Sequence, residues 1–285
     1  MALLKRSPKP VPDDEGRMSL MDHLRELRNR IVKMMLAVVA GTVVGFTFFS
    51  PIWTFITGPF CRLPPQYRFG GSTGCGLVVN SLTGGFMVNL KVAIIFGLVA
   101  AAPLWIYQLW AFVTPGLYRN ERRYTLTFLG IAVPLFLAGA GMAYLTMDKG
   151  LSLLLGFVPD NVVPLIDIDS YLSFLTMMLL IFGVAFLMPL LMAFLNIIGV
   201  LRFAVVSKHQ RMIVFLLFVF AAVATPSQDP FTMLALAAPM VLLFFVAEIF
   251  MYFHDKNAAV REAERQRALQ EELDGIAETS DDSRE

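Results

Sequence analysis

Long apolar blocks, separated by short segments that hold nearly all the charges, are the feature that most constrains this chain. The six blocks lie at about 34–57, 86–110, 124–147, 171–200, 212–226 and 231–252. A helix needs about 20 apolar residues to cross the hydrocarbon core of a bilayer, and the first four blocks reach that length. Hydrophobic residues make up 57% of the chain and charged residues 16%, whereas soluble domains carry about 25% charged residues. We therefore expect an all-α, polytopic membrane protein with six transmembrane helices.

The last two blocks are shorter than the others. The fifth stops at Thr225-Pro226 and the sixth is borderline in length. If both blocks cross, the bilayer around them is thinned locally; the alternative is a re-entrant pair. Prolines inside the blocks predict kinked helices and a concave scaffold, because each proline removes a backbone N–H and clashes with the preceding turn. These prolines are Pro103, Pro134, Pro189 and Pro239.

The distribution of Lys and Arg predicts the orientation of the chain. One set of flanks holds 19 of the 23 Lys and Arg residues, at 1–33, 111–123, 201–211 and 253–285. Lys and Arg accumulate in the cytoplasmic loops of membrane proteins, so we expect both termini to be cytosolic. The chain then divides into a cytosolic tail at 1–18, a transmembrane domain at 19–253 and a second cytosolic tail at 254–285.

An amphipathic segment precedes the first block. Ser19 and Asp22 have the spacing of a capping box, and apolar residues follow at helical spacing: Leu20, Leu24, Leu27 and Ile31. We predict a helix that lies in the membrane interface and runs into the first span. Glu26 falls on the polar side of this segment. An ion pair with Arg30 at i,i+4 would explain Glu26 without any further function.

Three motifs, in order along the chain, resemble the TatC family, the multispanning subunit of the twin-arginine protein translocase. The first is His23-Leu-Arg-Glu26-Leu-Arg28-Asn-Arg30. The second joins Ala102-Pro103 to Tyr107-Gln108-Leu-Trp110-Ala-Phe112-Val-Thr-Pro115-Gly-Leu-Tyr118-Arg-Asn-Glu121-Arg122-Arg123. The third, in the last external turn, is Thr225-Pro226-Ser-Gln-Asp229-Pro230. The resemblance covers about residues 19–253.

The resemblance implies a signal-peptide receptor and core subunit of a translocase. Such a translocase exports folded proteins across the cytoplasmic membrane and uses the proton-motive force. The implied partners are twin-arginine signal peptides, single-span TatA/TatB-type subunits, other TatC copies and the lipid bilayer. The resemblance implies no enzymatic activity, no cofactor, no metal and no nucleic acid.

The same resemblance assigns signal-peptide binding to particular positions, namely Glu26, Glu121, Arg28, Phe112, Arg122 and Arg123. The chemistry of the two acids agrees with this role, because carboxylates accept guanidinium groups bidentately through charge-assisted hydrogen bonds. Basic neighbours would repel a generic cationic peptide, which leaves specificity to the paired fork geometry. The alternatives are a local salt bridge of Glu121 to Arg119 or Arg123, and an interfacial anchoring role for Phe112.

Two further positions match the family as scaffold residues, with Pro59 just outside the first span and Asp229 in the last external turn. Their alternatives are simple helix termination by Pro59 and a helix cap by Asp229 before Phe231. Cys61 and Cys75 both fall in the first external loop, an oxidising location. A disulfide between them would contribute about 3 kcal/mol of stability. Two free thiols are the alternative.

The fourth span departs from the family pattern at Leu187, where many members carry Glu or Gln. This departure leaves the docking site of partner helices open. Glu248 lies in the sixth block, near its cytosolic end. Acids inside a membrane are functional by default, and the alternative for Glu248 is interfacial snorkelling near His254 and Lys256.

Two other function classes fit the sequence less well. A proton-coupled small-molecule transporter would show several ionisable groups at mid-membrane and repeat symmetry, but the block centres are nearly free of charge. An intramembrane enzyme would need a motif such as HExxH, GxSxG or paired aspartates, and none occurs in the sequence. The three histidines are scattered over the flanks and predict no metal site: His23, His209 and His254.

Overall fold

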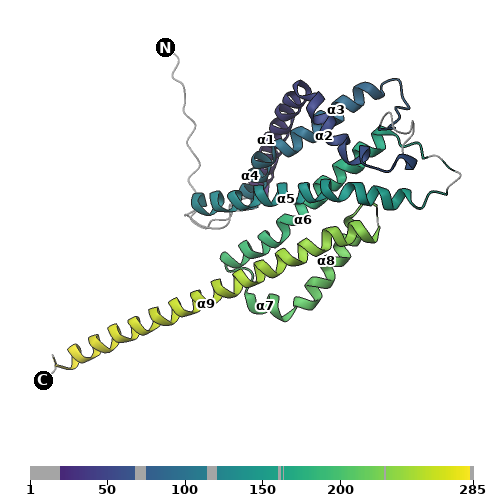
Figure 1. Cartoon of the computed structure of the whole chain (residues 1–285). Helices are drawn as coiled ribbons and strands as arrows, with labels where there is room; N and C mark the ends of the chain where they lie inside the picture. Colours follow the sequence, from purple (N-terminus) through teal and green to yellow (C-terminus); the bar gives the residue numbers. More distant parts are fainter. Residues whose placement is uncertain are drawn as a thin grey trace, which may run out of the picture.

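The structure is a computed structural model that describes residues 20–67, 75–113, 121–159, 162, 164–227 and 229–282. Within these ranges the chain is helical (Figure 1). The elements are α1 (Leu20–Thr47), α2 (Phe49–Cys61), the 3-10 turn η1 (Pro65–Tyr67), α3 (Gly84–Ala100), α4 (Ala102–Val113), α5 (Glu121–Leu155), α6 (Ile168–Ile197), α7 (Phe203–Lys208), α8 (Gln210–Ala224) and α9 (Pro230–Asp282).

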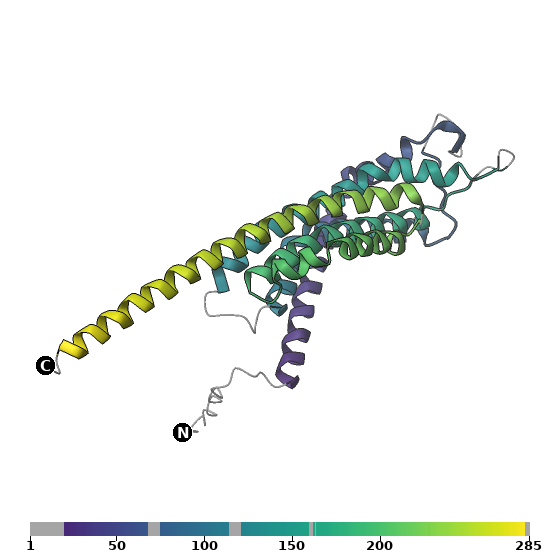
Figure 2. The ribbon, with the colours of Figure 1, turned by 90° about the horizontal axis from the view of Figure 1, so that it is seen from below.

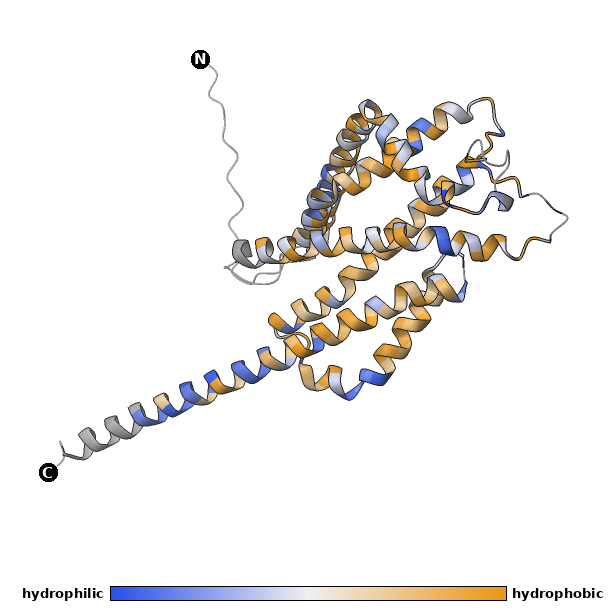
Figure 3. Cartoon of the chain, viewed as in Figure 1, coloured by the Kyte–Doolittle hydropathy of each residue, from blue (hydrophilic) through white to orange (hydrophobic). Residues whose placement is uncertain are grey.

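Six segments of the described chain account for the six predicted spans. Helices α1, α5, α6 and α9 are each long and apolar enough to cross a membrane. Helices α3 and α4 together form a fifth, broken span that bends by 58°. The sixth is the short apolar helix α8, which corresponds to the block predicted to be short. Apolar residues dominate all of these helices, whereas the C-terminal half of α9 is hydrophilic (Figure 3).

The first span differs from the prediction in both its start and its end. Helix α1 runs unbroken from Leu20 to Thr47, so the amphipathic segment runs into the first span as predicted, but the apolar span begins at Leu24 and not at residue 34. The helix then ends at Thr47, ten residues before the predicted boundary, and α2 begins at Phe49. Pro51 explains this break, because it has no N–H to donate to the Thr47 carbonyl oxygen four residues earlier and its ring clashes with that carbonyl.

The bend between α3 and α4 lies where Pro103 predicted a kink. Pro103 sits in the first turn of α4, directly after the break at Ala101. The break leaves the Leu98 carbonyl oxygen without its usual i+4 partner, and the Trp105 indole N–H donates to that oxygen at 2.9 Å. The other three prolines lie inside helices that continue through them: Pro134 in α5, Pro189 in α6 and Pro239 in α9.

Close backbone contact joins α1 to α3. A Cβ on Gly41 would lie 2.8 Å from the Gly97 Cα, and a Cβ on Gly45 would lie 2.9 Å from the Ala93 carbonyl oxygen. Small residues four apart on both helices therefore face each other, the arrangement that lets membrane helices approach without bulky side chains between them. This pairing of small residues was not predicted from the sequence.

Helix α9 is the longest element, with 53 residues. The predicted sixth span ended at 252, and the predicted domain boundary lay at 254, but the helix continues through both positions to Asp282. Its C-terminal part extends away from the other helices (Figures 1 and 2). The reason is local, because the segment is rich in Ala, Glu, Arg and Leu, which are strong helix formers even in water.

The end of the molecule opposite this extension is linked by contacts between segments that are distant in sequence. Val78 and Asp167 form an isolated parallel bridge, and the Asn80 amide donates to the Asp167 carboxylate at 3.3 Å. The Lys91 ammonium of α3 lies 2.6 Å from the Asp169 carboxylate of α6. These polar contacts hold the start of α6 against the loop that precedes α3.

Candidate functional site

Helix α4 brings together the three segments that carry the predicted signal-peptide site. It packs against both α1, which holds Glu26 and Arg28, and α5, which begins at Glu121. Phe112 lies in the last turn of α4 and is half-buried. The helix thereby connects the two acidic segments at the end of the molecule where the C-terminal part of α9 leaves the other helices (Figure 1). We refer to this as the Glu121 end.

An aromatic cluster of three rings fixes the position of α4 near the Glu121 end. The indole of Trp110 stacks on Phe128 of α5, with ring centroids 3.5 Å apart. The same indole meets Phe194 of α6 edge to face at 4.0 Å. Trp110 is only 3% exposed. Buried aromatic pairs of this kind add about 0.5–1.5 kcal/mol each beyond their packing, so the cluster holds the end of α4 against α5 and α6.

Glu26 pairs with Arg30 one helical turn along α1. The Arg30 guanidinium donates through Nε at 2.9 Å and through a terminal nitrogen, and both hydrogen bonds reach Oε1 of Glu26. The i,i+4 ion pair predicted as the alternative interpretation is therefore present. Oε2 of Glu26 accepts no hydrogen bond from the residues that the structure describes. One carboxylate oxygen thus has capacity for a further donor.

The other predicted basic and acidic residues are described less completely. Arg28 is exposed on α1. The backbones of Glu121, Arg122 and Arg123 form the first turn of α5, while their side chains lie outside the described residues. The local salt bridges predicted as alternatives for Glu121 fall outside the described residues too.

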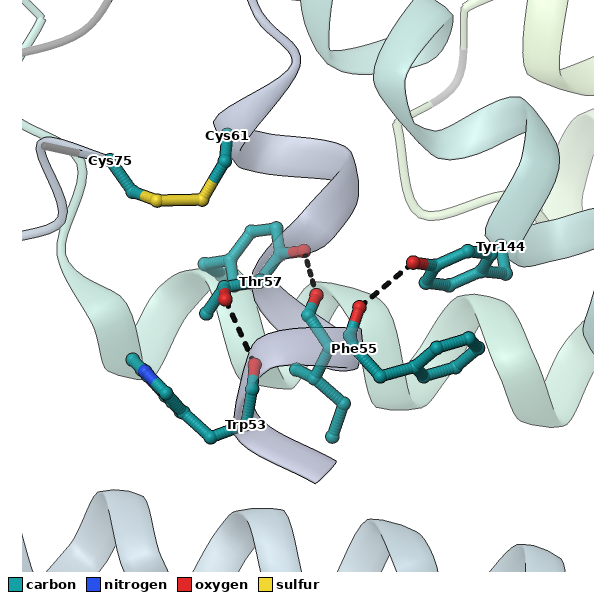
Figure 4. Close-up of a disulfide and its surroundings, with 8 residues drawn as sticks. Trp53, Phe55, Thr57, Cys61, Cys75 and Tyr144 are labelled. Atoms are coloured by element: carbon teal, nitrogen blue, oxygen red, sulfur yellow. Dashed lines mark hydrogen bonds between the residues drawn. A yellow bond between two sulfur atoms is a disulfide. The ribbon is translucent and has the colours of Figure 1, made fainter. Parts of the chain in front are cut away.

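Pro59, at the opposite end of the molecule, is a scaffold residue with a definite partner. It lies outside the first span, as predicted, but it does not terminate a helix, because α2 continues for two residues beyond it. Pro59 has no N–H for the Phe55 carbonyl oxygen, four residues earlier. The Tyr144 hydroxyl of α5 donates to that oxygen at 2.8 Å, and its ring stacks on Phe55 (Figure 4). A second tyrosine, Tyr171 of α6, donates to the next carbonyl oxygen, that of Ile56, at 2.6 Å.

A disulfide closes the loop that follows α2. The bond joins Cys61, the last residue of α2, to Cys75, with the two Cα atoms 4.8 Å apart (Figure 4). Together with the two tyrosine hydroxyls, it ties α2 to α5, to α6 and to the loop before α3. The sequence predicted the disulfide, but it contained no signal for the tyrosine contacts.

Asp229 caps helix α9, as its alternative interpretation predicted. One carboxylate oxygen accepts from the Thr232 backbone N–H at 2.8 Å, and the other accepts from the Thr232 hydroxyl. Pro230 occupies the first helical position, which suits a residue without an N–H. Burial by itself would raise the pKa of the Asp229 carboxyl, but hydrogen bonds from Ser227 and Thr232 outweigh burial and hold the pKa below its usual range.

Leu187, the residue at which the sequence departs from the expected family pattern, packs against a hydrophobic cluster that includes Trp105, Trp110 and Phe136. Its apolar side chain suits these rings. Among the described residues, no group of three or more His, Cys, Asp or Glu side chains could hold a metal ion.

Known proteins are similar to this chain in both sequence and fold. A family model described as Sec-independent protein translocase protein (TatC) matches residues 22–239. The Sec-independent protein translocase protein TatC of Frankia casuarinae is 46% identical over 252 residues, which cover 87% of this chain and 69% of that protein. The TatC protein of Xylanimonas cellulosilytica is 37% identical over 260 residues, which cover 91% and 92% of the two chains.

A solved structure supports the same relationship. The crystal structure of a twin-arginine translocase receptor, TatC, superimposes with a TM-score of 0.65 at 28% identity. The match covers 80% of this chain and 99% of that chain. Sequence and fold therefore agree over the membrane-spanning helices. The chain belongs to the TatC family of Sec-independent protein translocase proteins.

Proposed function

We propose that this protein is the signal-peptide receptor and core subunit of a twin-arginine translocase in the cytoplasmic membrane. The family membership and the likeness to a twin-arginine translocase receptor support this function. In this role the protein binds twin-arginine signal peptides and helps folded proteins to cross the membrane, driven by the proton-motive force. The binding energy comes from charge-assisted hydrogen bonds and requires no catalytic group.

The geometry of Glu26 is the observation that carries the proposed recognition step. Its Oε1 is held by Arg30, whereas no described residue donates to its Oε2, which can therefore accept a second guanidinium. A planar guanidinium can bind such a carboxylate side-on, which an ammonium cannot do equally well. Glu121, at the start of α5, would accept the second arginine of the peptide. The requirement for two arginines follows from two separate acceptors connected by α4.

The charge distribution supports the orientation. The basic flanks of the chain lie at the ends of α1, α4, α5, α6 and α9 that form the Glu121 end. We place this end in the cytosol, where signal peptides arrive, and the disulfide at the opposite, oxidising side.

Single-span TatA/TatB-type subunits and other TatC copies are the proposed partners. An apolar cavity of about 340 Å³ lies between α5, α6 and α9 and is lined by side chains such as Ile131, Leu190 and Leu243. Because this lining is apolar, partner helices would dock there through van der Waals packing, which drives helix association in lipid.

Photo-crosslinking of a twin-arginine peptide to the purified protein tests the proposal. We expect Glu26→Gln and Glu121→Gln each to reduce crosslinking about 10–100-fold, since hydrogen bonds to charged groups contribute about 1.5–3 kcal/mol. Glu262→Gln, which removes the same charge from an exposed site on α9, is the matched control. A folded twin-arginine reporter in membrane vesicles then tests export with the same variants.

Arg30→Gln distinguishes peptide binding from structural support. If the Glu26–Arg30 pair only stabilises α1, both Glu26→Gln and Arg30→Gln weaken crosslinking through the loss of helix stability. If Glu26 receives the peptide, Arg30→Gln retains crosslinking because it removes a competing guanidinium. Undiminished crosslinking in both glutamate variants would rule out this site.

A further inference from the structure

A buried acid lies in the membrane domain outside the signal-peptide site. Glu248 of α9 is 8% exposed. It stands 18 residues after the start of α9, about 27 Å along the helix at 1.5 Å per residue. The hydrocarbon core is about 30 Å thick, so a span that enters this core at Pro230 would hold the carboxyl inside it, near its far edge.

The surroundings of Glu248 are apolar. Phe244 and Met251, one turn before and one turn after it on the same face of α9, are both fully buried. They pack in one hydrophobic cluster with Val206 of α7 and with Ile213 of α8. On the neighbouring face, Ala247 lines the apolar cavity between α5, α6 and α9. The side chain therefore lies on the face of α9 that packs against other helices.

Glu248 makes no hydrogen bond and no ion pair with any residue that the structure describes. The charged or titratable groups at this end of α7 and α8 are all exposed: Arg202, Lys208, His209 and Arg211. Helix α5 faces this part of α9 through Thr127, Phe128 and Ile131, none of which titrates.

The remaining polar groups near this end lie on α9 and at the end of α6. Tyr252 and Lys256 follow Glu248 on α9, and the Lys256 ammonium lies 6.0 Å from the centroid of the Tyr252 ring. On α9 itself, Asp255 accepts from the Asn196 amide of α6 at 2.9 Å and from the Phe203 backbone N–H of α7 at 2.8 Å. His254 lies 3.5 Å from the Asp255 carboxylate. The titratable groups of α6, Asp169 and Tyr171, lie at its opposite end. No described group therefore compensates a negative charge on Glu248.

An isolated carboxylate in such surroundings is strongly disfavoured, and a carboxyl group avoids this cost by taking up a proton. We propose that Glu248 is a proton-binding site of the membrane domain. The carboxyl is protonated while α7 and α8 pack on α9, and it releases the proton when this packing loosens and water reaches it. This proposal concerns the proton alone and holds whether or not Glu26 and Glu121 bind the signal peptide.

The sign of the pH dependence follows from proton linkage. The packed state binds one proton more than the loosened state, so rising pH favours loosening. One proton can change the equilibrium at most tenfold per pH unit, which corresponds to about 1.36 kcal/mol. Gln at this position keeps the size of the side chain, is neutral at every pH, and therefore removes the pH dependence of the packing equilibrium.

Infrared spectroscopy tests the protonation directly. In an ester-free maltoside detergent at neutral pH, the wild-type protein is expected to show the C=O stretching band of a protonated carboxylic acid. The band disappears in Glu248→Gln and persists in Glu262→Gln, which removes an exposed acid from the same helix. A spectrum that is the same in wild type and in Glu248→Gln overturns the proposal.

A cysteine at Val206, a residue of α7 that is 1% exposed and packs on this face of α9, tests the coupling to packing. Maleimide labelling of Val206→Cys is measured as a function of pH with Glu248 and with Glu248→Gln. The labelling rate with Glu248 is divided by the rate with Glu248→Gln, and this ratio cancels the intrinsic pH dependence of the thiol. We expect this ratio to rise with pH, by at most tenfold per unit, and a ratio independent of pH contradicts the coupling. Export activity enters neither measurement, so failure here is distinguishable from failure of the signal-peptide site.

Discussion

Removal of one hydroxyl, in Tyr144→Phe, tests how this fold tolerates a proline inside α2. The substitution keeps the ring that stacks on Phe55 at 4.3 Å between centroids and removes only the hydrogen bond to the Phe55 carbonyl oxygen. That oxygen cannot bond to residue 59, because Pro59 has no N–H. Loss of such a hydrogen bond costs about 0.5–1.5 kcal/mol. For a chain of this size, that loss lowers the melting temperature by about 2–4 °C per kcal/mol.

A double-mutant cycle with Pro59→Ala isolates the physical cause. Alanine restores the N–H that can bond to the Phe55 carbonyl oxygen within the helix. In the Pro59→Ala background, Tyr144→Phe is therefore expected to cost less, with a coupling of about 1 kcal/mol between the two sites, since a hydrogen bond contributes about that much net stability. The stability of Pro59→Ala itself does not affect the result, because the cycle compares only the cost of Tyr144→Phe in the two backgrounds.

Thermal unfolding in detergent, followed by helical circular dichroism, provides the measurement. Tyr107→Phe is the matched control, since Tyr107 is 42% exposed and its hydroxyl makes no hydrogen bond with the described residues. An equal cost of Tyr144→Phe with and without Pro59 would refute the reasoning, because it would show that Tyr144 stabilises α2 independently of the proline.

Three further predictions concern the scaffold. Reduction of the Cys61–Cys75 disulfide is expected to lower the free energy of unfolding by about 3 kcal/mol, and an unchanged melting temperature on addition of reductant would count against this. Gly97→Ala is expected to cost about 1–3 kcal/mol through overpacking, because the new Cβ would lie 2.6 Å from the backbone of α1. The control Gly130→Ala should be neutral or stabilising, because its Cβ would have nothing within 4 Å. Similar melting temperatures for the two variants would disprove close α1–α3 contact. The depressed pKa of Asp229 predicts that its contribution to stability is full above the usual carboxyl pKa of about 4 and is lost as pH falls through the lower folded-state pKa. The difference in stability between wild type and Asp229→Asn should therefore shrink on acidification. A difference that stays constant with pH would contradict the cap.

The lengths of the apolar blocks were sufficient to predict six apolar helical segments, the fifth of them short, because the bilayer imposes a minimum length on each span. They did not predict where helices begin and end. Pro51 divides the first block at Thr47, although Pro134 is accommodated inside the continuous helix α5. A proline in the sequence shows only that one backbone hydrogen bond is missing and does not show whether the helix breaks at that position.

The sequence by itself determined the family, the helical class and the six apolar segments, since these depend on local composition and on motif order, and it supplied the two acids of the proposed arginine-binding site. Tertiary structure alone decided that Tyr144 supplies the donor that Pro59 lacks, that Gly41 meets Gly97, and that Glu248 is buried without a partner among the described residues. The two contacts join residues far apart in the chain, and the burial of Glu248 depends on neighbouring helices. Their existence depends on how helices approach one another in space, and no pattern within a single helix records that geometry.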